Sequence, residues 1–185
     1  MPTNKIILGL VGEMGAGKST LTEYIKTKHG AVSFRFSDML ADIARRLYLE
    51  QSRPNLQLIS TMIRQHISED IMSKVIMKDA AEADALIVIT EGVRRPTDIT
   101  YLKELPNFYL IGITADERTR YERVLVRSEK TDDQTKTWEE FQRDGQAEAE
   151  QKIKEIKAVA DFQIDNNGTK EDLYKQIEEI LKNVN

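Results

Sequence analysis

Eight consecutive residues near the start of the chain have the types and spacing of a phosphate-binding loop. Residues 12–19 read Gly-Glu-Met-Gly-Ala-Gly-Lys-Ser, which fits the pattern G-x-x-x-x-G-K-[ST] at every fixed position. Glycines let backbone N–H groups approach a polyphosphate closely, and a helix that begins near Lys18 would point its positive end at the same anion. Lys18 would contact the β- and γ-phosphates, and the Ser19 hydroxyl would ligate Mg²⁺. The pattern therefore predicts a site for ATP and Mg²⁺, and the candidate nucleotide-binding residues are Gly12, Glu13, Met14, Gly15, Ala16, Gly17, Lys18, Ser19 and Thr20.

The residues on either side of this loop match the context that the pattern requires. Residues 6–11 form a short aliphatic run, which is typical of a buried parallel strand. After the loop, Leu21 and Ile25 lie four apart, as on one face of a helix. We expect a strand over residues 5–11 and a helix over 18–29, which Gly30 ends. A chance glycine turn before a helix is the alternative interpretation, and the match at every fixed position in this context disfavours it.

Length and composition indicate a single globular domain. The 185 residues are 40% hydrophobic and 31% charged, and they include no cysteine, which excludes disulfides, thiolate zinc sites and cysteine nucleophiles. No apolar run approaches the roughly 20 residues of a membrane span, and the first strand leaves no room for a signal peptide, so we expect a cytoplasmic protein. The net charge of −4 disfavours a nucleic-acid surface. Any basic cluster is therefore expected to bind a small anionic substrate.

Strand-like and helix-like segments alternate along the rest of the chain. We expect strands over residues 31–36, 86–90, 108–114 and 162–165, and helices over 38–49, 96–105, 116–127, 138–159 and 170–181. Residues 56–83 form a long amphipathic segment, whose apolar stripe indicates core packing, and residues 128–137 are a polar loop. This order predicts an α/β fold with a five-stranded parallel sheet that helices cover on both faces.

In such sheets ligands bind beyond the carboxyl ends of the strands, so the residues that follow each strand are the candidates for chemistry. Asp38, after the second strand, could accept a proton from a substrate hydroxyl or hydrogen-bond the substrate, and the alternative role is a helix cap. Glu91, after the third strand, could hold a Mg²⁺-bound water. Arg94 and Arg95 could bind a phosphate through paired N–H donors, and the alternative is an exposed, salt-bridged turn.

The fourth and fifth strands are followed by further candidates. Arg123 and Arg127 share a helix face, where they could neutralise the charge on a transferring phosphoryl group. For Arg118 and Arg120, earlier in this helix, we prefer the interpretation of a solvated face paired with nearby glutamates. After the last strand, a turn that contains Asn167 and Gly168 should return to the phosphate loop and could border a purine ring, although a plain turn would look the same.

These motifs together resemble those of small P-loop kinases in the nucleoside monophosphate kinase and dephospho-CoA kinase branch, close to archaeal kinase-like proteins. Residues 9–20 resemble the opening strand and loop of that family, and residues 123–127 its lid-helix motif R-L-x-x-R. Residues 160–169 are similar to its ending A-D-x-x-I-x-N-x-G-[ST], whose loop borders the adenine. The resemblance spans nearly the whole chain.

Two of the matching segments differ from the family patterns. Residues 36–40 are similar to the adenylate-kinase segment T-G-D-M-L-R, but Ser37 and Ala41 stand in place of the glycine and arginine, and Arg45 or Arg46 could compensate. Residues 91–95 resemble the acceptor motif D-G-x-x-R, with Glu91 in place of aspartate. The related archaeal pattern D-G-x-R would select Arg94 rather than Arg95 as the phosphate ligand.

The resemblance implies a single P-loop kinase domain over residues 1–185. Its core would comprise residues 1–37, 84–126 and 144–185, with a helical acceptor-binding insertion over 38–83 and a lid over 127–143. The implied reaction is ATP- and Mg²⁺-dependent phosphoryl transfer to a small anionic acceptor, and a nucleoside or deoxynucleoside monophosphate is favoured because Arg94 and Arg95 imply an anion on it. The alternatives are transfer to a hydroxyl of dephospho-CoA, with Asp38 as base, a regulatory NTPase without an acceptor, and an interaction protein that retains the loop as a relic. Both a monomer and a homodimer remain open.

Overall fold

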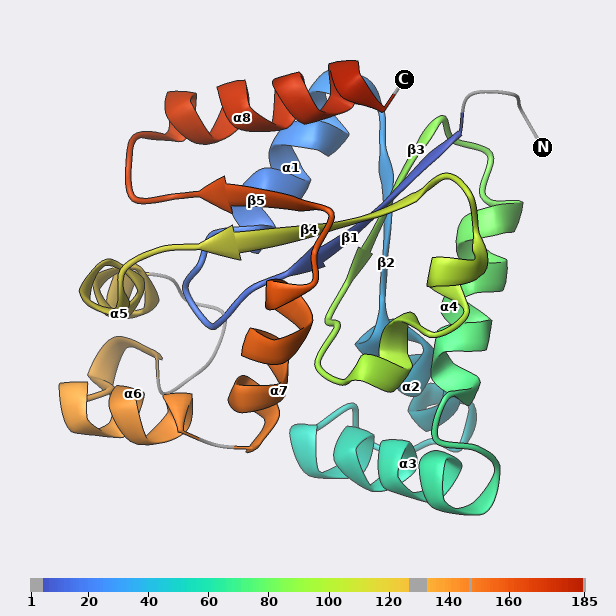
Figure 1. Ribbon diagram of the computed structural model, residues 1–185. Helices are drawn as coiled ribbons and strands as arrows, with labels where there is room; N and C mark the ends of the chain where they lie inside the picture. The colour runs from blue at the N-terminus through green and yellow to red at the C-terminus, as the bar shows by residue number, and fades with distance from the viewer. Residues whose placement is uncertain (1–4, 127–132, 147, 185) are drawn as a thin grey trace.

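Five parallel strands form one sheet at the centre of the molecule (Figure 1). The computed structural model describes residues 5–126, 133–146 and 148–184. The strands are β1 (Ile6–Val11), β2 (Val32–Arg35), β3 (Ile87–Glu91), β4 (Phe108–Thr114) and β5 (Phe162–Asp165). Their order across the sheet is β2-β3-β1-β4-β5. The predicted five-stranded parallel sheet is therefore confirmed.

The central position of β1 decides where the phosphate loop lies. β1 pairs with β3, with Ile6 opposite Ile87, and on its other side with β4, where Ile7 lies opposite Phe108. All six residues of β1 are buried. Because the five strands are parallel, their carboxyl ends meet at one edge of the sheet. The loop that follows β1 therefore lies between the segments that follow β3 and β4.

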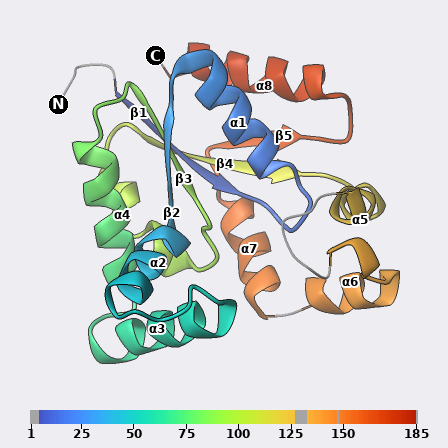
Figure 2. The ribbon, with the colours of Figure 1, turned by 180° about the vertical axis from the view of Figure 1, so that it is seen from behind.

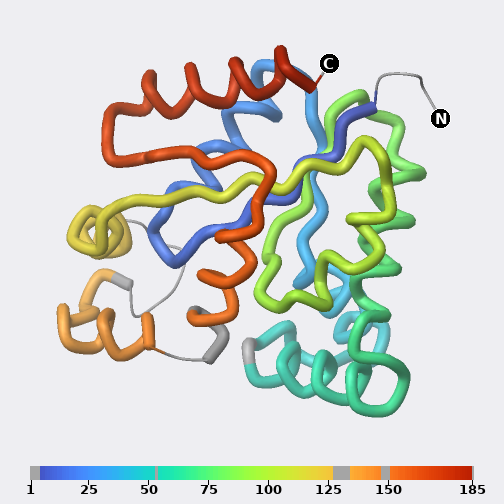
Figure 3. Tube along the Cα trace, viewed as in Figure 1, coloured from blue at the N-terminus to red at the C-terminus, as the bar shows by residue number. Residues whose placement is uncertain are grey.

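Helices cover both faces of the sheet, as Figures 1 and 2 show from opposite sides. One face carries α1 and α8, and the other carries α2, α3, α4 and α7 together with two short 3₁₀ helices. The trace in Figure 3 shows α5 and α6 side by side, beyond the carboxyl ends of β4 and β5. The helices are α1 (Lys18–His29), α2 (Phe36–Arg46), α3 (Arg53–His66), α4 (Ile71–Glu82), η1 (Pro96–Ile99), η2 (Leu102–Glu104), α5 (Glu117–Val126), η3 (Asp133–Thr135), α6 (Trp138–Gly145), α7 (Glu148–Ala158) and α8 (Lys170–Asn183).

Two hydrophobic cores hold these layers together. Successive side chains of a strand point to opposite faces of the sheet. In β1, Leu8 and Leu10 accordingly pack against α1 and α8, whereas Ile7 and Val11 pack against α2, α4 and α7. The aliphatic run that predicted a buried strand thus supplies both cores, which makes β1 a rigid support for the loop that follows it.

The helix predicted over residues 38–49 is displaced at both ends. α2 begins at Phe36 because the Asp38 carboxylate accepts a hydrogen bond from the backbone N–H of Arg35, at 3.1 Å, and Arg35 rather than Ser37 or Asp38 takes the first capping position. α2 ends at Arg46, and Tyr48 has a φ of 57°, a left-handed conformation that cannot continue a right-handed helix.

Two segments with continuous helical periodicity are each divided. Residues 56–83 belong to α3 and α4, separated at residues 67–70, and the single helix predicted over 138–159 is α6 followed by α7. α6 ends at Gly145, a residue that disfavours helix interiors. The periodicity did not reveal the first break because Ile63 of α3 and Met72 of α4 pack in the same core. The helix predicted over 96–105 is instead the two short 3₁₀ helices η1 and η2.

In the part of the chain that the structure describes, no helix combines the length and the apolar character that crossing a bilayer requires.

Candidate functional site

The loop between β1 and α1 has, at two positions, a backbone conformation that strongly favours glycine. Gly15 and Gly17 have φ values of 79° and 106°. A Cβ atom on Gly15 would lie 2.4 Å from the backbone oxygen of Arg120, and one on Gly17 would lie 2.1 Å from Nδ2 of Asn166. The loop is therefore enclosed by α5 on one side and by the β5–α8 turn on the other.

Lys18 lies with its ammonium group against the loop backbone. Its Nζ donates to the carbonyl oxygens of Gly12, at 2.6 Å, and of Glu13, at 3.0 Å. Ser19 is exposed in the first turn of α1, followed by Thr20. α1 follows the loop directly, so the positive end of this helix faces the loop, and no side chain of the described residues caps it at Gly17, as an anion site requires.

The side chain of Glu13 contacts α7. Glu13 is 7% exposed, and its two carboxylate oxygens lie 3.0 Å and 2.8 Å from Nζ of Lys157. Burial raises the pKa of the Glu13 carboxyl, but the hydrogen bond to Lys157 and the charges of Lys157 and Arg120 outweigh this effect, and the pKa lies below its ordinary value. Sequence reasoning missed Lys157, which is one of several charged residues along a predicted helix.

Arg120 also contacts the loop, contrary to the interpretation of a solvated face. Its Nη1 donates to the carbonyl oxygen of Met14 at 3.2 Å, and its Nε donates to that of Ala115 at 3.1 Å. Sequence reasoning missed this role because spacing places Arg120 on a helix face but cannot show what packs against that face. Arg118 is exposed and pairs with Glu122 at 3.3 Å, which confirms the solvated-face interpretation for that residue.

Arg123 is half-buried in α5, and its Nη1 is buried without a hydrogen-bond partner among the described residues. An unpaired buried donor is costly in a protein interior, and an anion would satisfy it.

Arg127, the second arginine predicted on this face, lies outside the described residues, as do residues 128–132 of the predicted lid. The described part, from residue 133 on, is held to α5 by Tyr121, whose hydroxyl donates to the carbonyl of Lys136 at 2.9 Å and whose ring contacts Trp138.

The turn after β5 lies beside the phosphate loop, as expected. The residue that contacts the loop is Asn166, which is buried and donates from Nδ2 to the carbonyl oxygen of Ala16 at 2.8 Å. Asn167 and Gly168 are exposed, and Oδ1 of Asn167 accepts a hydrogen bond from the backbone N–H of Asp116 at 2.7 Å. The turn thereby joins the loops that follow β1 and β4.

Glu91, at the end of β3, has one carboxylate oxygen that the described residues leave unsatisfied. Glu91 is 6% exposed, Oε2 lies 3.6 Å from Nε of Arg35, and Oε1 is buried without a hydrogen-bond partner in the described part of the chain. A water molecule bound to Mg²⁺ would satisfy this oxygen, so Ser19 and Glu91 fit a magnesium ion that also binds phosphates. Within the described ranges, no group of three or more His, Cys, Asp or Glu side chains forms a metal site.

The turn that carries Arg94 and Arg95 is held by a buried carboxylate. Asp98 is 2% exposed, and its Oδ2 accepts hydrogen bonds from the backbone N–H groups of Arg94, at 2.9 Å, and Arg95, at 3.0 Å. Its Oδ1 lies 2.6 Å from Nη2 of Arg64 in α3. The side chain of Arg95 pairs with Glu69 at 3.3 Å, whereas Arg94 is exposed and forms no ion pair with a described residue. The structure thus distinguishes two arginines that look equivalent in the sequence.

The other predicted acceptor residues lie on α2. Asp38 is exposed near the start of this helix, where it is the capping residue described above and remains accessible. Arg45, near the far end of α2, is exposed and pairs with Asp42 at 2.6 Å, and Arg46 is exposed beside it. No described contact brings Arg45 to the phosphate loop.

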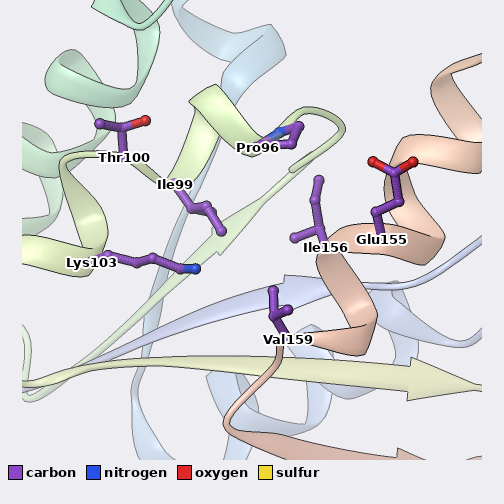
Figure 4. A pocket seen from close by; sticks show the side chains of 7 residues that line it. All are labelled: Pro96, Ile99, Thr100, Lys103, Glu155, Ile156 and Val159. Atoms are coloured by element: carbon purple, nitrogen blue, oxygen red, sulfur yellow. The ribbon is translucent and has the colours of Figure 1, made fainter.

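A groove of about 360 Å³ lies between η1 and α7 (Figure 4). Ile99 of η1 and Ile156 of α7 stand on opposite sides of it, and Lys103 and Glu155 contribute charged groups to its lining. Because Pro96 also lines the groove and directly follows Arg95, the groove lies next to the turn that carries the two arginines.

Comparisons with known proteins find a family and relatives that match most of this chain. A family profile described as an AAA domain (AAA_17) matches residues 11–142. The chain is 25% identical over 178 residues to a UPF0200 protein of Hyperthermus butylicus, and the alignment covers 96% of this chain and 94% of that protein. It is 27% identical over 181 residues to a UPF0200 protein of Methanocaldococcus jannaschii, with 97% and 90% covered.

Two solved structures with a similar fold are shikimate kinases. The enzyme from Bacteroides thetaiotaomicron has a TM-score of 0.63 at 11% identity, with 97% of this chain and 98% of that chain covered. The enzyme from Aquifex aeolicus has a TM-score of 0.55 at 17% identity, with 96% of each chain covered. The narrower resemblance to nucleoside monophosphate and dephospho-CoA kinases stays a prediction. The chain belongs to the AAA domain family AAA_17, and its fold is similar to that of these shikimate kinases.

Proposed function

We propose that this protein is an ATP- and Mg²⁺-dependent kinase that transfers the γ-phosphoryl group to a small anionic acceptor, with a nucleoside or deoxynucleoside monophosphate as the favoured acceptor. The observation that carries the proposal is the pairing of β1 with β3. Because of this pairing, the phosphate loop and the turn of Arg94 follow neighbouring parallel strands at the same edge of the sheet, and Arg94 is exposed without an ion-pair partner among the described residues. A cation left without a protein partner next to a nucleotide loop is suited to a second anion.

In such a transfer, the residues around the loop would have different roles. The loop N–H groups and Lys18 would bind the β- and γ-phosphates, and the Asn167–Gly168 turn would border the adenine. Arg123, with Arg127, would neutralise the charge that spreads over the transferring group, so that catalysis rests on positioning and electrostatic stabilisation. Mg²⁺, when bound through Ser19 and the Glu91 water, would supply further positive charge to the phosphates.

Replacement of Arg94 by glutamine should affect the KM for the acceptor much more than the same replacement of Arg95. We expect Arg94→Gln to raise the KM for the acceptor about 10- to 100-fold, because a charge-assisted hydrogen bond contributes about 1.5–3 kcal/mol. Arg95→Gln should change it little, because Arg95 already pairs with Glu69. The measurement is a coupled ATP-consumption assay over nucleoside and deoxynucleoside monophosphates, dephospho-CoA and shikimate.

Equal effects of the two substitutions would contradict the assignment of Arg94. ATP hydrolysis that no compound in the panel stimulates would instead favour a regulatory NTPase. The absence of ATP binding would favour an interaction protein with a relic loop.

Transfer to a hydroxyl group is the second candidate reaction. Asp38 is exposed near the carboxyl end of β2, and the similar folds include shikimate kinases, whose named compound carries hydroxyl groups and a carboxylate. Asp38→Asn should lower turnover about 10²- to 10⁴-fold if Asp38 is a general base for a hydroxyl, and far less for a monophosphate. Asparagine keeps an oxygen that can accept the N–H of Arg35, so thermal melting of the variant should stay close to that of the unaltered protein.

A further inference from the structure

We propose that Lys157 is a positioning residue for the phosphate loop: its ammonium group holds the Glu13 carboxylate and thereby keeps the loop backbone in the shape that receives a triphosphate. This inference rests on the ATP binding in the proposed function, but not on the identity of the acceptor. Lys157 lies in α7, far along the chain from the loop, and none of the motifs contains it.

Glu13 connects this ion pair to the part of the loop that would face the nucleotide. Its carboxylate accepts from Nζ of Lys157 through both oxygens, at 3.0 Å and 2.8 Å. Its backbone carbonyl accepts from Nζ of Lys18, at 3.0 Å, and from the backbone N–H of Ala16, at 3.2 Å. A shift of Glu13 would therefore move the carbonyl against which Lys18 lies.

Contacts with two strands, β4 and β5, fix the position of Lys157. Its backbone carbonyl accepts a hydrogen bond from Nε2 of Gln163, in β5, at 2.6 Å. Its side chain passes over Gly112 of β4, where a Cβ atom would lie 2.8 Å from Cγ of Lys157 and 2.5 Å from Oε1 of Gln163. Gly112 thus leaves the space through which the lysine side chain reaches the loop.

The charges explain why this pair matters beside a triphosphate. The side chains of Glu13 and Lys157 are only 9% and 16% exposed. Without Lys157, a mostly buried carboxylate would lose its partner next to the negative phosphates, and loss of one member of a buried pair is far more damaging than loss of both. The other cations at Glu13 are Arg120, whose guanidinium binds the Met14 carbonyl, and Lys18, whose ammonium binds the carbonyl of Glu13 itself.

Binding of Mg·ATP, measured by isothermal titration calorimetry, tests the inference. Lys157→Met should weaken binding about 100-fold, whereas the double variant Glu13→Gln/Lys157→Met should recover to about 10-fold weaker than the unaltered protein, because no orphan charge remains. Lys154→Met, an exposed lysine on the same helix, is the matched control and should bind as the unaltered protein does. The KM for the acceptor should not change in any of them.

Each contrary result has a distinct meaning. If Lys157→Met binds Mg·ATP as tightly as the unaltered protein, the inference is wrong and the proposed function stands. Equal losses in the single and double variants would show that Lys157 does not act through Glu13, which also overturns it. If Lys157→Met does not fold, the affinity of the double variant for Mg·ATP tests the inference. An affinity equal to that of the unaltered protein would then contradict the inference. Failure of the unaltered protein to bind Mg·ATP would overturn the proposed function together with this inference.

Discussion

Replacement of Lys18 by alanine is expected to lower ATP turnover about 10²- to 10³-fold, the effect of removing one preorganised donor from a charged transition state. Nζ of Lys18 lies within 3.0 Å of two loop carbonyls, those of Gly12 and Glu13, so its charge is held at the loop that we propose receives the terminal phosphates. ATP affinity should fall as well, because in the proposed site the ammonium group would contact the β- and γ-phosphates before and during transfer. Steady-state kinetics and calorimetry with Mg·ATP measure the two effects separately.

Lys26→Ala is the matched control for this substitution. Lys26 lies on the same helix, is exposed and forms an ion pair with Glu23 at 3.4 Å, its only ion pair with a described residue. We expect the control to keep full turnover. Unchanged affinity and turnover in Lys18→Ala would falsify the proposed nucleotide site, and a parallel loss in Lys26→Ala would point to destabilisation of α1.

Replacement of Arg123 by alanine should lower kcat about 10³-fold while the KM for ATP changes little, because an arginine that neutralises a transferring phosphoryl group acts mainly in the transition state. The Nη1 of Arg123 is buried without a partner among the described residues, which is the state expected of a donor that is satisfied only by the bound substrates. For the same reason, the melting temperature of the variant should not fall. Single-turnover kinetics and thermal melting test both statements.

Arg118→Ala tests whether any arginine of α5 would give this result. Arg118 is exposed and pairs with Glu122 at 3.3 Å, so its loss should leave kcat close to that of the unaltered protein. A variant Arg123→Ala that melts at a lower temperature and keeps its kcat would show that Arg123 supports the fold rather than the reaction.

The two arginines after β3 show what kind of information the sequence lacks. Arg94 and Arg95 are adjacent and chemically identical, so motif resemblance left both as phosphate ligands. The structure separates them through Glu69, which lies 26 positions from Arg95 and takes up its charge, and through Asp98, which fixes the backbone of both. Asp98 in turn needs Arg64, from the helical segment between β2 and β3.

The sequence by itself determines those features of this protein that depend on residues close together in the chain. The phosphate loop can be predicted because all its fixed residues lie within eight consecutive positions. Its glycines are required by the backbone conformation of the loop and by the close approach of N–H groups to a phosphate. The parallel sheet is readable because each strand is a short apolar run between helical segments. Helix ends were read less well, since apolar periodicity continues across the break at residues 67–70, where both helices pack in one core.

The partners of the charged residues were decided only by the tertiary structure. Glu13 and Lys157 are separated by 144 positions, and Asn166 and the Ala16 carbonyl that it binds by 150. No local pattern records such pairs, because each member alone is an ordinary charged or polar residue. Burial also leaves an oxygen of Glu91 and a nitrogen of Arg123 without hydrogen-bond partners among the described residues, and this burial arises from the packing of whole elements around the edge of the sheet. The residue types at the site are thus a property of the sequence, and their division into structural and ligand-binding roles is a property of the fold.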